Sequence, residues 1–183
     1  MNWNEHWNLK NKHAFLSASK YHWINYDADR LISVYQNWKA KERGTRLHEF
    51  ACEAITLGVK LSHSKRTLNQ YVNDAIGFGM TPELILYYSD NCFGTADAVS
   101  FDGKLLRIHD LKTGVTTASF HQLEIYAALF CLEYNYSPDD IDIVLRIYQS
   151  DEILECSPDL SAIVDIMNTI VDFDSVVESL KEG

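Results

Sequence analysis

The apolar residues of this sequence change their period near its middle, and this change constrains the fold more than any other feature. Apolar residues at helical spacing predict helices over 27–41, 45–58, 67–78, 120–135 and 158–181. Alternating or β-branched residues predict strands over 83–88, 91–101, 104–112 and 141–149. The order of these elements predicts an α/β (α+β sandwich) fold with a central mixed sheet of about four strands flanked by helices.

The pair Asp102-Gly103 separates the second and third predicted strands. Asp-Gly between alternating apolar residues is a strong signal for a two-residue hairpin turn. Such a turn places Phe101 opposite Lys104, so that the numbers of facing residues sum to 205. The sequence therefore predicts a hairpin with a defined register.

This register brings three charged residues to one face of the hairpin. Asp97 lies opposite Ile108 and becomes a diagonal neighbour of Asp110, with backbones roughly 7–8 Å apart. Lys112 returns to the same face two residues later. Two such carboxylates repel each other unless a cation lies between them or one is protonated. The set predicts a Mg²⁺ site in which Lys112 orients or deprotonates water, although the tripeptide D-x-K also occurs by chance in surface strands.

Other candidate site residues lie on predicted helices. Gln122 and Tyr126 are spaced i, i+4 and share one helix face, where they would contact a phosphate or brace the lysine. The alternative is an ordinary polar helix surface. His48 near the start of an earlier helix is by itself more typical of a packed or solvated residue. Glu49 and Glu53 are either solvated acids or secondary ligands.

Composition bounds the class of protein. The net charge of −10 opposes non-specific attraction to nucleic acid, although cations concentrate between Lys39 and Arg66. No apolar run reaches the length of a bilayer span, and the first residues lack the apolar segment of a secretory signal. Four cysteines without a CxxC pair favour buried free thiols. We expect a cytoplasmic protein that is not bound to a membrane.

Four motifs in order, "GTRLHEF", "GTADAV", "HDLKTG" and "HQLEIY", together resemble the RecB-type branch of the PD-(D/E)XK nuclease superfamily. That branch shows a G-x-x-x-H helix, an aspartate strand, a D-x-K strand and a Q-x-x-x-Y helix. The opening "FLSASKYHW" also resembles phage and bacterial members. The resemblance covers most of the chain and implies a restriction-endonuclease-like fold.

The resemblance implies roles for the matching residues. Mg²⁺ or Mn²⁺ would be bound by His48, Asp97, Asp110 and the carbonyl of Leu111. Lys112 would position water or act as general base. Gln122 and Tyr126 would shape the site and hold DNA.

The sequence departs from the family in two respects. Several relatives carry an iron–sulfur cluster, but "YHWINYDAD" has no cysteine, and Cys131 and Cys156 are not grouped. We therefore predict no cluster. The chain also shows no helicase portion or extra DNA-gripping module, so we expect one domain over 1–183, loose over 1–12. Specificity would come from a homo-oligomer or a protein partner, with the apolar last helix as a candidate contact surface.

The resulting hypothesis is a metal-dependent DNA nuclease, an exonuclease or end-processing enzyme of phage or bacterial recombination, replication or repair. One alternative is a catalytically inactive nuclease-fold protein that binds DNA or a protein partner, which the acidic charge favours. Another is a metal-dependent hydrolase acting on a nucleotide or RNA.

Overall fold

A computed structural model describes residues 7, 14–115 and 117–181 of the 183-residue chain. The chain forms two compact units, residues 1–45 and 46–183. Apart from Trp7, the segment 1–12 that was expected to be loose lies outside the described residues. The assignment of a single domain stays a prediction.

The first unit is built around aromatic residues. It contains the 3-10 helix η2 (Ala18–Asn25) and the start of α1 (Ala28–Thr56). Phe15 packs edge-on against Tyr35 and contacts Trp38, at ring-centroid distances of 5.0 and 5.6 Å. The Asp27 side chain caps α1, because it accepts a hydrogen bond from the Arg30 backbone N–H at 2.7 Å.

The prediction of separate helices over 27–41 and 45–58 is wrong, because α1 continues through Gly44 and Thr45 to Thr56. A single glycine costs a helix only about 1 kcal/mol relative to alanine. The neighbouring sequence "KAKER" consists of strong helix formers, which offset that cost.

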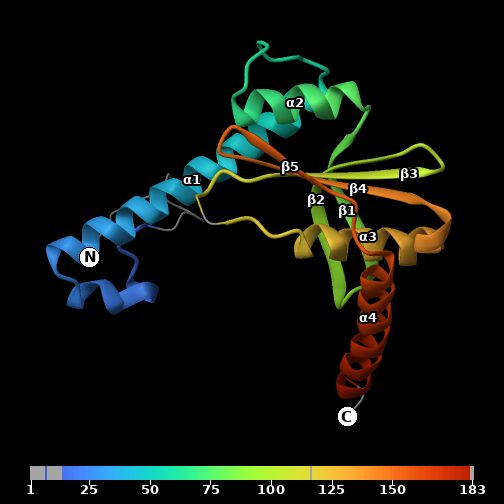
Figure 1. The fold of residues 1–183 in the computed structure, drawn as a ribbon. Helices are drawn as coiled ribbons and strands as arrows, with labels where there is room; N and C mark the ends of the chain where they lie inside the picture. Colours follow the sequence, from blue (N-terminus) through green and yellow to red (C-terminus); the bar gives the residue numbers. More distant parts are fainter. Residues whose placement is uncertain (1–6, 8–13, 116, 182–183) are drawn as a thin grey trace. The chain divides into compact units, whose positions relative to one another are not determined.

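The second unit contains a five-stranded mixed sheet of order β1-β2-β3-β4-β5 (Figure 1). Its strands are β1 (Thr81–Ser89), β2 (Cys92–Phe101), β3 (Leu105–Leu111), β4 (Asp142–Gln149) and β5 (Glu152–Cys156). Only β3 and β4 pair in parallel. The predicted α+β class with a mixed sheet flanked by helices is confirmed, with one more strand than expected.

The additional strand is β5, which forms a hairpin with β4. Gln149 pairs with Glu152, so the turn consists of Ser150 and Asp151 alone. Both turn residues have positive φ, 53° and 65°. Such turns usually contain glycine. Because this turn has none, the sequence did not indicate a hairpin here.

Helices cover both faces of the sheet. The crossover helix α3 (His121–Tyr134) and α4 (Leu160–Lys181) pack on one face, where Leu106, Ile108 and Leu123 are fully buried. On the other face, α2 (Thr67–Gly77) and the last turns of α1 form a second apolar cluster that includes Ala51 and Val72. The central strands of the sheet therefore lie between two apolar layers.

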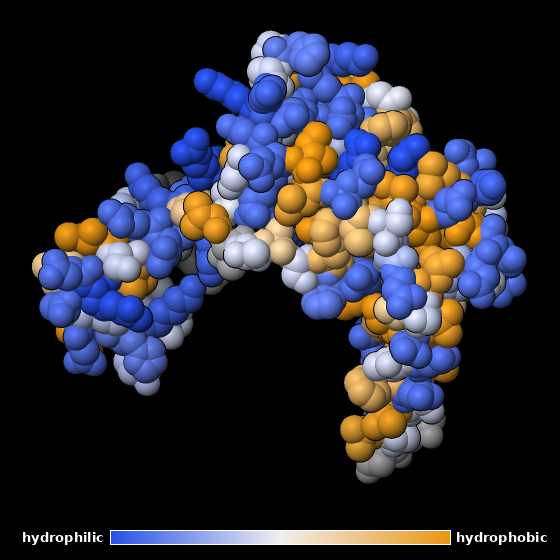
Figure 2. All heavy atoms as spheres, viewed as in Figure 1, coloured by the Kyte–Doolittle hydropathy of each residue, from blue (hydrophilic) through white to orange (hydrophobic). Residues whose placement is uncertain are grey.

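The last turns of α4 contribute little to this core. Its buried residues are Ile163 and Ile170. Figure 2 shows apolar side chains on the surface of its C-terminal half, where Phe173 is 66% exposed and Leu180 75% exposed. Among the described residues, no helix combines the length and apolar character required to cross a membrane.

The predicted two-residue turn between β2 and β3 is wrong. Phe101 pairs with Leu106, so the facing numbers sum to 207 and four residues separate the paired positions. The Asp102 carboxylate accepts hydrogen bonds from the backbone N–H groups of Lys104 and Leu105, at 3.0 and 2.8 Å, and this stabilises the wider loop. The register differs from the prediction by two residues, and an even shift does not by itself move a side chain to the other face of its strand.

Candidate metal centre

The candidate site lies where β2 and β3 separate. Their pairing ends at Ala98 and His109, while β2 continues beside β1 and β3 continues beside β4. One step beyond that last pair stand Asp97 and Asp110. The Asp97 Oδ2 atom accepts a hydrogen bond of 2.7 Å from the Leu111 backbone N–H, which bridges the two strands at this point.

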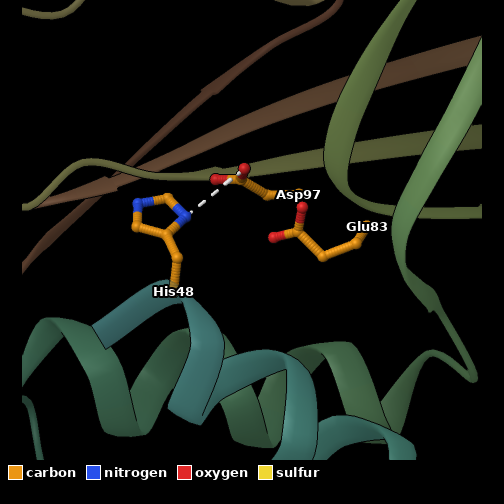
Figure 3. A group of neighbouring side chains, drawn as sticks. All are labelled: His48, Glu83 and Asp97. Carbon is orange, nitrogen blue, oxygen red and sulfur yellow. Dashed lines mark ion pairs between the residues drawn. The ribbon is translucent and has the colours of Figure 1, made fainter. Parts of the chain in front are cut away.

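Three side chains converge there from three elements, as Figure 3 shows. His48 comes from α1, Glu83 from β1 and Asp97 from β2, and each offers one ligand atom within 4.8 Å of the others. The His48 Nδ1 atom is 3.5 Å from Asp97 Oδ1. An imidazole and two carboxylates at this separation form a candidate binding site for a divalent ion.

Glu83 was not predicted as a site residue. Its φ of +49° lies in the left-handed region, and the pairing of β1 with β2 skips it, so that Pro82 pairs with Ala98 and Leu84 with Ala96. Positive φ in a residue other than glycine costs energy and is often found at functional sites. The available sequence signal was an acidic residue at the start of an otherwise apolar strand.

The alternation of faces along β2 is interrupted at the same level. Ala96 and Val99 both belong to the apolar cluster beside α3, whereas Ala98 belongs to the cluster beside α2. Strict alternation would place Ala96 and Ala98 on one face. The prediction of one uniform face along this part of β2 is therefore wrong, and the irregularity coincides with Asp97 and Glu83.

Asp110 is buried, with 4% of its surface exposed. Lys112 Nζ lies 3.1 Å from Asp110 Oδ1 and 3.0 Å from Oδ2. Among the described residues, Oδ2 has no well-directed hydrogen-bond donor. Burial, followed by the charge of Asp97, raises the pKa of Asp110 despite the opposing effect of Lys112. This carboxylate would gain from a further cation.

The pKa values of three neighbouring titratable side chains are raised as well. Burial and then the Asp97 charge raise the pKa of Glu83. The hydrogen bond with Asp97 raises the pKa of His48 above its ordinary value, against the opposing effect of burial. Tyr71 of α2 is 2% exposed, and burial followed by the nearby carboxylates raises the pKa of its phenol, so this side chain stays neutral beside the acids.

A chain of hydrogen bonds connects Lys112 to α3 and β2. Lys112 Nζ donates to the Gln122 side-chain oxygen at 2.9 Å, the Gln122 amide donates to the Tyr126 hydroxyl at 3.1 Å, and that hydroxyl donates to the Thr95 carbonyl at 2.7 Å. A Cβ atom on Gly94 would lie 2.8 Å from Tyr126 Cε1, so glycine permits this approach. The geometry holds the ammonium group in place.

The structure thus brings His48 and Asp97 together directly and places Asp110 with Lys112, Gln122 and Tyr126 in one contact chain. Glu49 and Glu53 are exposed on α1 and are not part of the three-residue cluster. The role of the Leu111 carbonyl stays a prediction. Carboxylate oxygens with one imidazole suit a hard or borderline divalent ion such as Mg²⁺ or Mn²⁺, and Asp110 Oδ2, which is ion-paired with Lys112 but accepts no well-directed hydrogen bond among the described residues, fits such a ligand set.

No protein-family model matches the sequence, and no curated protein matches it. A solved structure of the protein SSO0001 is similar over 72% of this chain and 86% of its own, with 12% sequence identity and a TM-score of 0.30. A likeness this low supports no conclusion about activity. The resemblance to RecB-type nucleases stays a prediction.

Proposed function

We propose that this protein is a metal-dependent deoxyribonuclease that hydrolyses phosphodiester bonds in DNA. The observation that supports the proposal is the convergence of His48, Glu83 and Asp97 beside the Asp110–Lys112 pair. Acids gathered where two strands of the sheet separate, with raised pKa values for Glu83 and Asp110, favour the binding of a cation.

Four side chains would hold the ion: His48, Glu83, Asp97 and Asp110. A bound divalent ion lowers the pKa of a water molecule and screens the negative charge that develops on the attacked phosphate. The hydrogen bond from the Leu111 backbone fixes one Asp97 oxygen and leaves the other directed toward His48. The protein therefore orients its ligands before an ion arrives.

Lys112 would act on the reacting groups themselves. Its ammonium group is about one-third exposed and is held between Asp110 and Gln122. In this position it would orient the attacking water and stabilise charge on a phosphate oxygen. Gln122 and Tyr126 would position Lys112 and border the path of the DNA backbone.

The choice of DNA, of an exonuclease or end-processing activity, and of a bacterial or phage-infected cytoplasm follows from the motif resemblance. The net charge of −10 disfavours tight unassisted binding of a polyanion. We therefore include in the proposal a homo-oligomer or protein partner that contributes to substrate binding.

A cleavage assay tests the proposal. End-labelled single- and double-stranded DNA is incubated with the protein in Mg²⁺, Mn²⁺ or EDTA, alongside Asp110→Ala and Lys112→Ala. Lys104→Ala and Asp142→Ala remove an exposed ion pair of 3.8 Å and serve as matched controls. We expect cleavage with metal, its loss in the two site variants and its retention in the controls. An inactive wild-type protein under every condition would contradict the proposal and favour a non-catalytic binding protein.

A further inference from the structure

One face of the β1–β2 hairpin carries a row of exposed side chains. Ile85 is 57% exposed, Tyr87 42% and Phe93 59%, and Thr95 is also exposed. The alternate residues Leu84, Leu86 and Ala96 pack in the core beside α3. The row therefore lies on the opposite face of the hairpin, which the helices leave uncovered at these positions.

This exposed row begins at the candidate metal centre. Thr95 pairs with Ile85, and Glu83 and Asp97 lie two residues further along the same two strands, where the regular pairing is interrupted. Phe93 is four residues from Asp97, which corresponds to about 13 Å along a strand. The row is continuous with the acidic cluster at one end and reaches an aromatic pair at the other.

The aromatic pair consists of Tyr87 and Phe93, which are cross-strand partners. Their rings are 6.4 Å apart between centroids and inclined by 29°. The Tyr87 hydroxyl donates to Asp90 at 3.0 Å, which anchors the edge of that ring. Two large rings thus stand side by side on an exposed strand face.

The charge of the hairpin decides which part of a polyanion would contact it. Residues 81–101 contain no lysine or arginine but include Glu83, Asp90 and Asp97. A phosphate group gains nothing from such a surface, whereas a base can stack on an aromatic ring without a charge partner. The surface suits the bases of an unpaired strand better than the backbone of a duplex.

We propose that Tyr87 and Phe93 form a stacking platform for the bases of single-stranded nucleic acid whose backbone reaches the metal centre. This inference rests on the proposed nuclease function and specifies its substrate as an unpaired strand or frayed end. At 3.4 Å for each stacked nucleotide, the distance of about 13 Å spans about four nucleotides, and fewer in an extended strand. The platform therefore contacts bases several nucleotides from the bond that is cleaved.

The test measures binding separately from cleavage. Fluorescein-labelled oligothymidylates of two and twelve nucleotides are titrated with protein in EDTA at 50 and 200 mM salt, and anisotropy is recorded. The variants are Phe93→Ala, Phe93→Leu and Phe93→Trp. Phe173→Ala removes a similarly exposed ring from α4 and serves as the matched control.

Stacking predicts a specific pattern. Phe93→Ala and Phe93→Leu weaken binding of the twelve-nucleotide strand roughly tenfold, because loss of a base–aromatic contact has about this effect. Phe93→Trp and Phe173→Ala bind like the wild type. The salt dependence stays unchanged in all variants because no phosphate contact is lost, and the two-nucleotide strand shows no difference.

Several results would overturn the platform. Equal binding by all variants, or no binding by the wild type, contradicts it even if the wild type cleaves DNA. Wild-type binding by Phe93→Leu together with loss of self-association in Phe93→Ala would assign the surface to a second copy of the chain. Stacking-dependent binding without cleavage in any metal would instead contradict the proposed nuclease function alone.

Discussion

His109 and Asp110 are neighbours on β3, and both are buried, yet their surroundings differ in kind. His109 faces the α2 side, where Phe78 meets its ring edge-on at 5.7 Å and the Tyr148 hydroxyl lies 3.3 Å from its Nδ1. Burial, and then the charges of Arg146 and Arg107, lower the pKa of His109 to about 3. This histidine is held neutral.

Asp110 follows on the opposite face of β3, where it is paired with Lys112 and lies near enough to Asp97 for that charge to raise its pKa. Each of the two buried residues has one polar atom, His109 Nε2 or Asp110 Oδ2, that makes no well-directed hydrogen bond in the described part of the chain, although Asp110 Oδ2 is ion-paired with Lys112 at 3.0 Å. The difference lies in the neighbouring charges. Arginines disfavour a proton or metal ion at His109, whereas the carboxylates around Asp110 favour a cation. Neighbouring charge, rather than burial, distinguishes a structural polar residue from a candidate site residue.

The largest expected effect is on the rate of cleavage, which should depend on Asp110 but not on His109. Asp110→Asn keeps the size of the side chain but removes its charge, so we expect cleavage to fall by at least about a hundredfold. His109→Gln should change the rate by less than about threefold where the protein remains folded, because His109 contacts no candidate ligand. Initial rates on single-stranded DNA and circular dichroism of each variant provide the measurement. Equal losses in both variants would contradict the distinction.

A smaller effect concerns stability in acid. The unfolded state binds a proton on His109 near pH 6.5, while the folded state does so only near pH 3, so stability falls as the pH decreases through this window. The loss from this residue amounts to about 2 kcal/mol at pH 5. His109→Phe should reduce the decrease in unfolding free energy between pH 7 and pH 5, measured by urea titration.

The exposed His63 provides the control for this pH effect. His63→Gln should leave the decrease between pH 7 and pH 5 as it is in the wild type. A decrease of the same size in His109→Phe would show that His109 is not the group responsible.

The smallest effect tests the backbone at Glu83. Glycine adopts positive φ without strain, so Glu83→Gly should raise the free energy of unfolding in EDTA by about 1 kcal/mol while weakening metal binding. Asn135→Gly changes another residue with positive φ, at the end of α3 and outside the cluster, and should leave metal binding unchanged. Lower stability of Glu83→Gly in EDTA would show that the Glu83 backbone is not strained.

The sequence placed Asp110 and Lys112 on one face of their strand, and contact of Gln122 and Tyr126 with the lysine was one of the alternatives that it left open. The hairpin register was wrong by two residues, but an even error does not change the face on which Asp110 and Lys112 lie. Helical i, i+4 spacing then brought Gln122 and Tyr126 together. Strand alternation and helical spacing were therefore the main basis for predicting this part of the site.

Features that depend on irregular backbone were not predicted. Glu83 enters the cluster through a left-handed conformation that no alternation pattern encodes, and β5 follows a turn without glycine. The continuation of α1 through Gly44 depends on neighbouring helix formers that outweigh one unfavourable residue. In each case the local preference of a residue was overridden by its surroundings.

Direct measurement of metal binding tests the central claim that these side chains bind a divalent ion. Isothermal titration calorimetry with Mn²⁺ should show one high-affinity site in the wild type, retained in Asp142→Asn and lost in Asp97→Asn. Wild-type binding that is unchanged in Asp97→Asn, or no binding in the wild type, would contradict the claim.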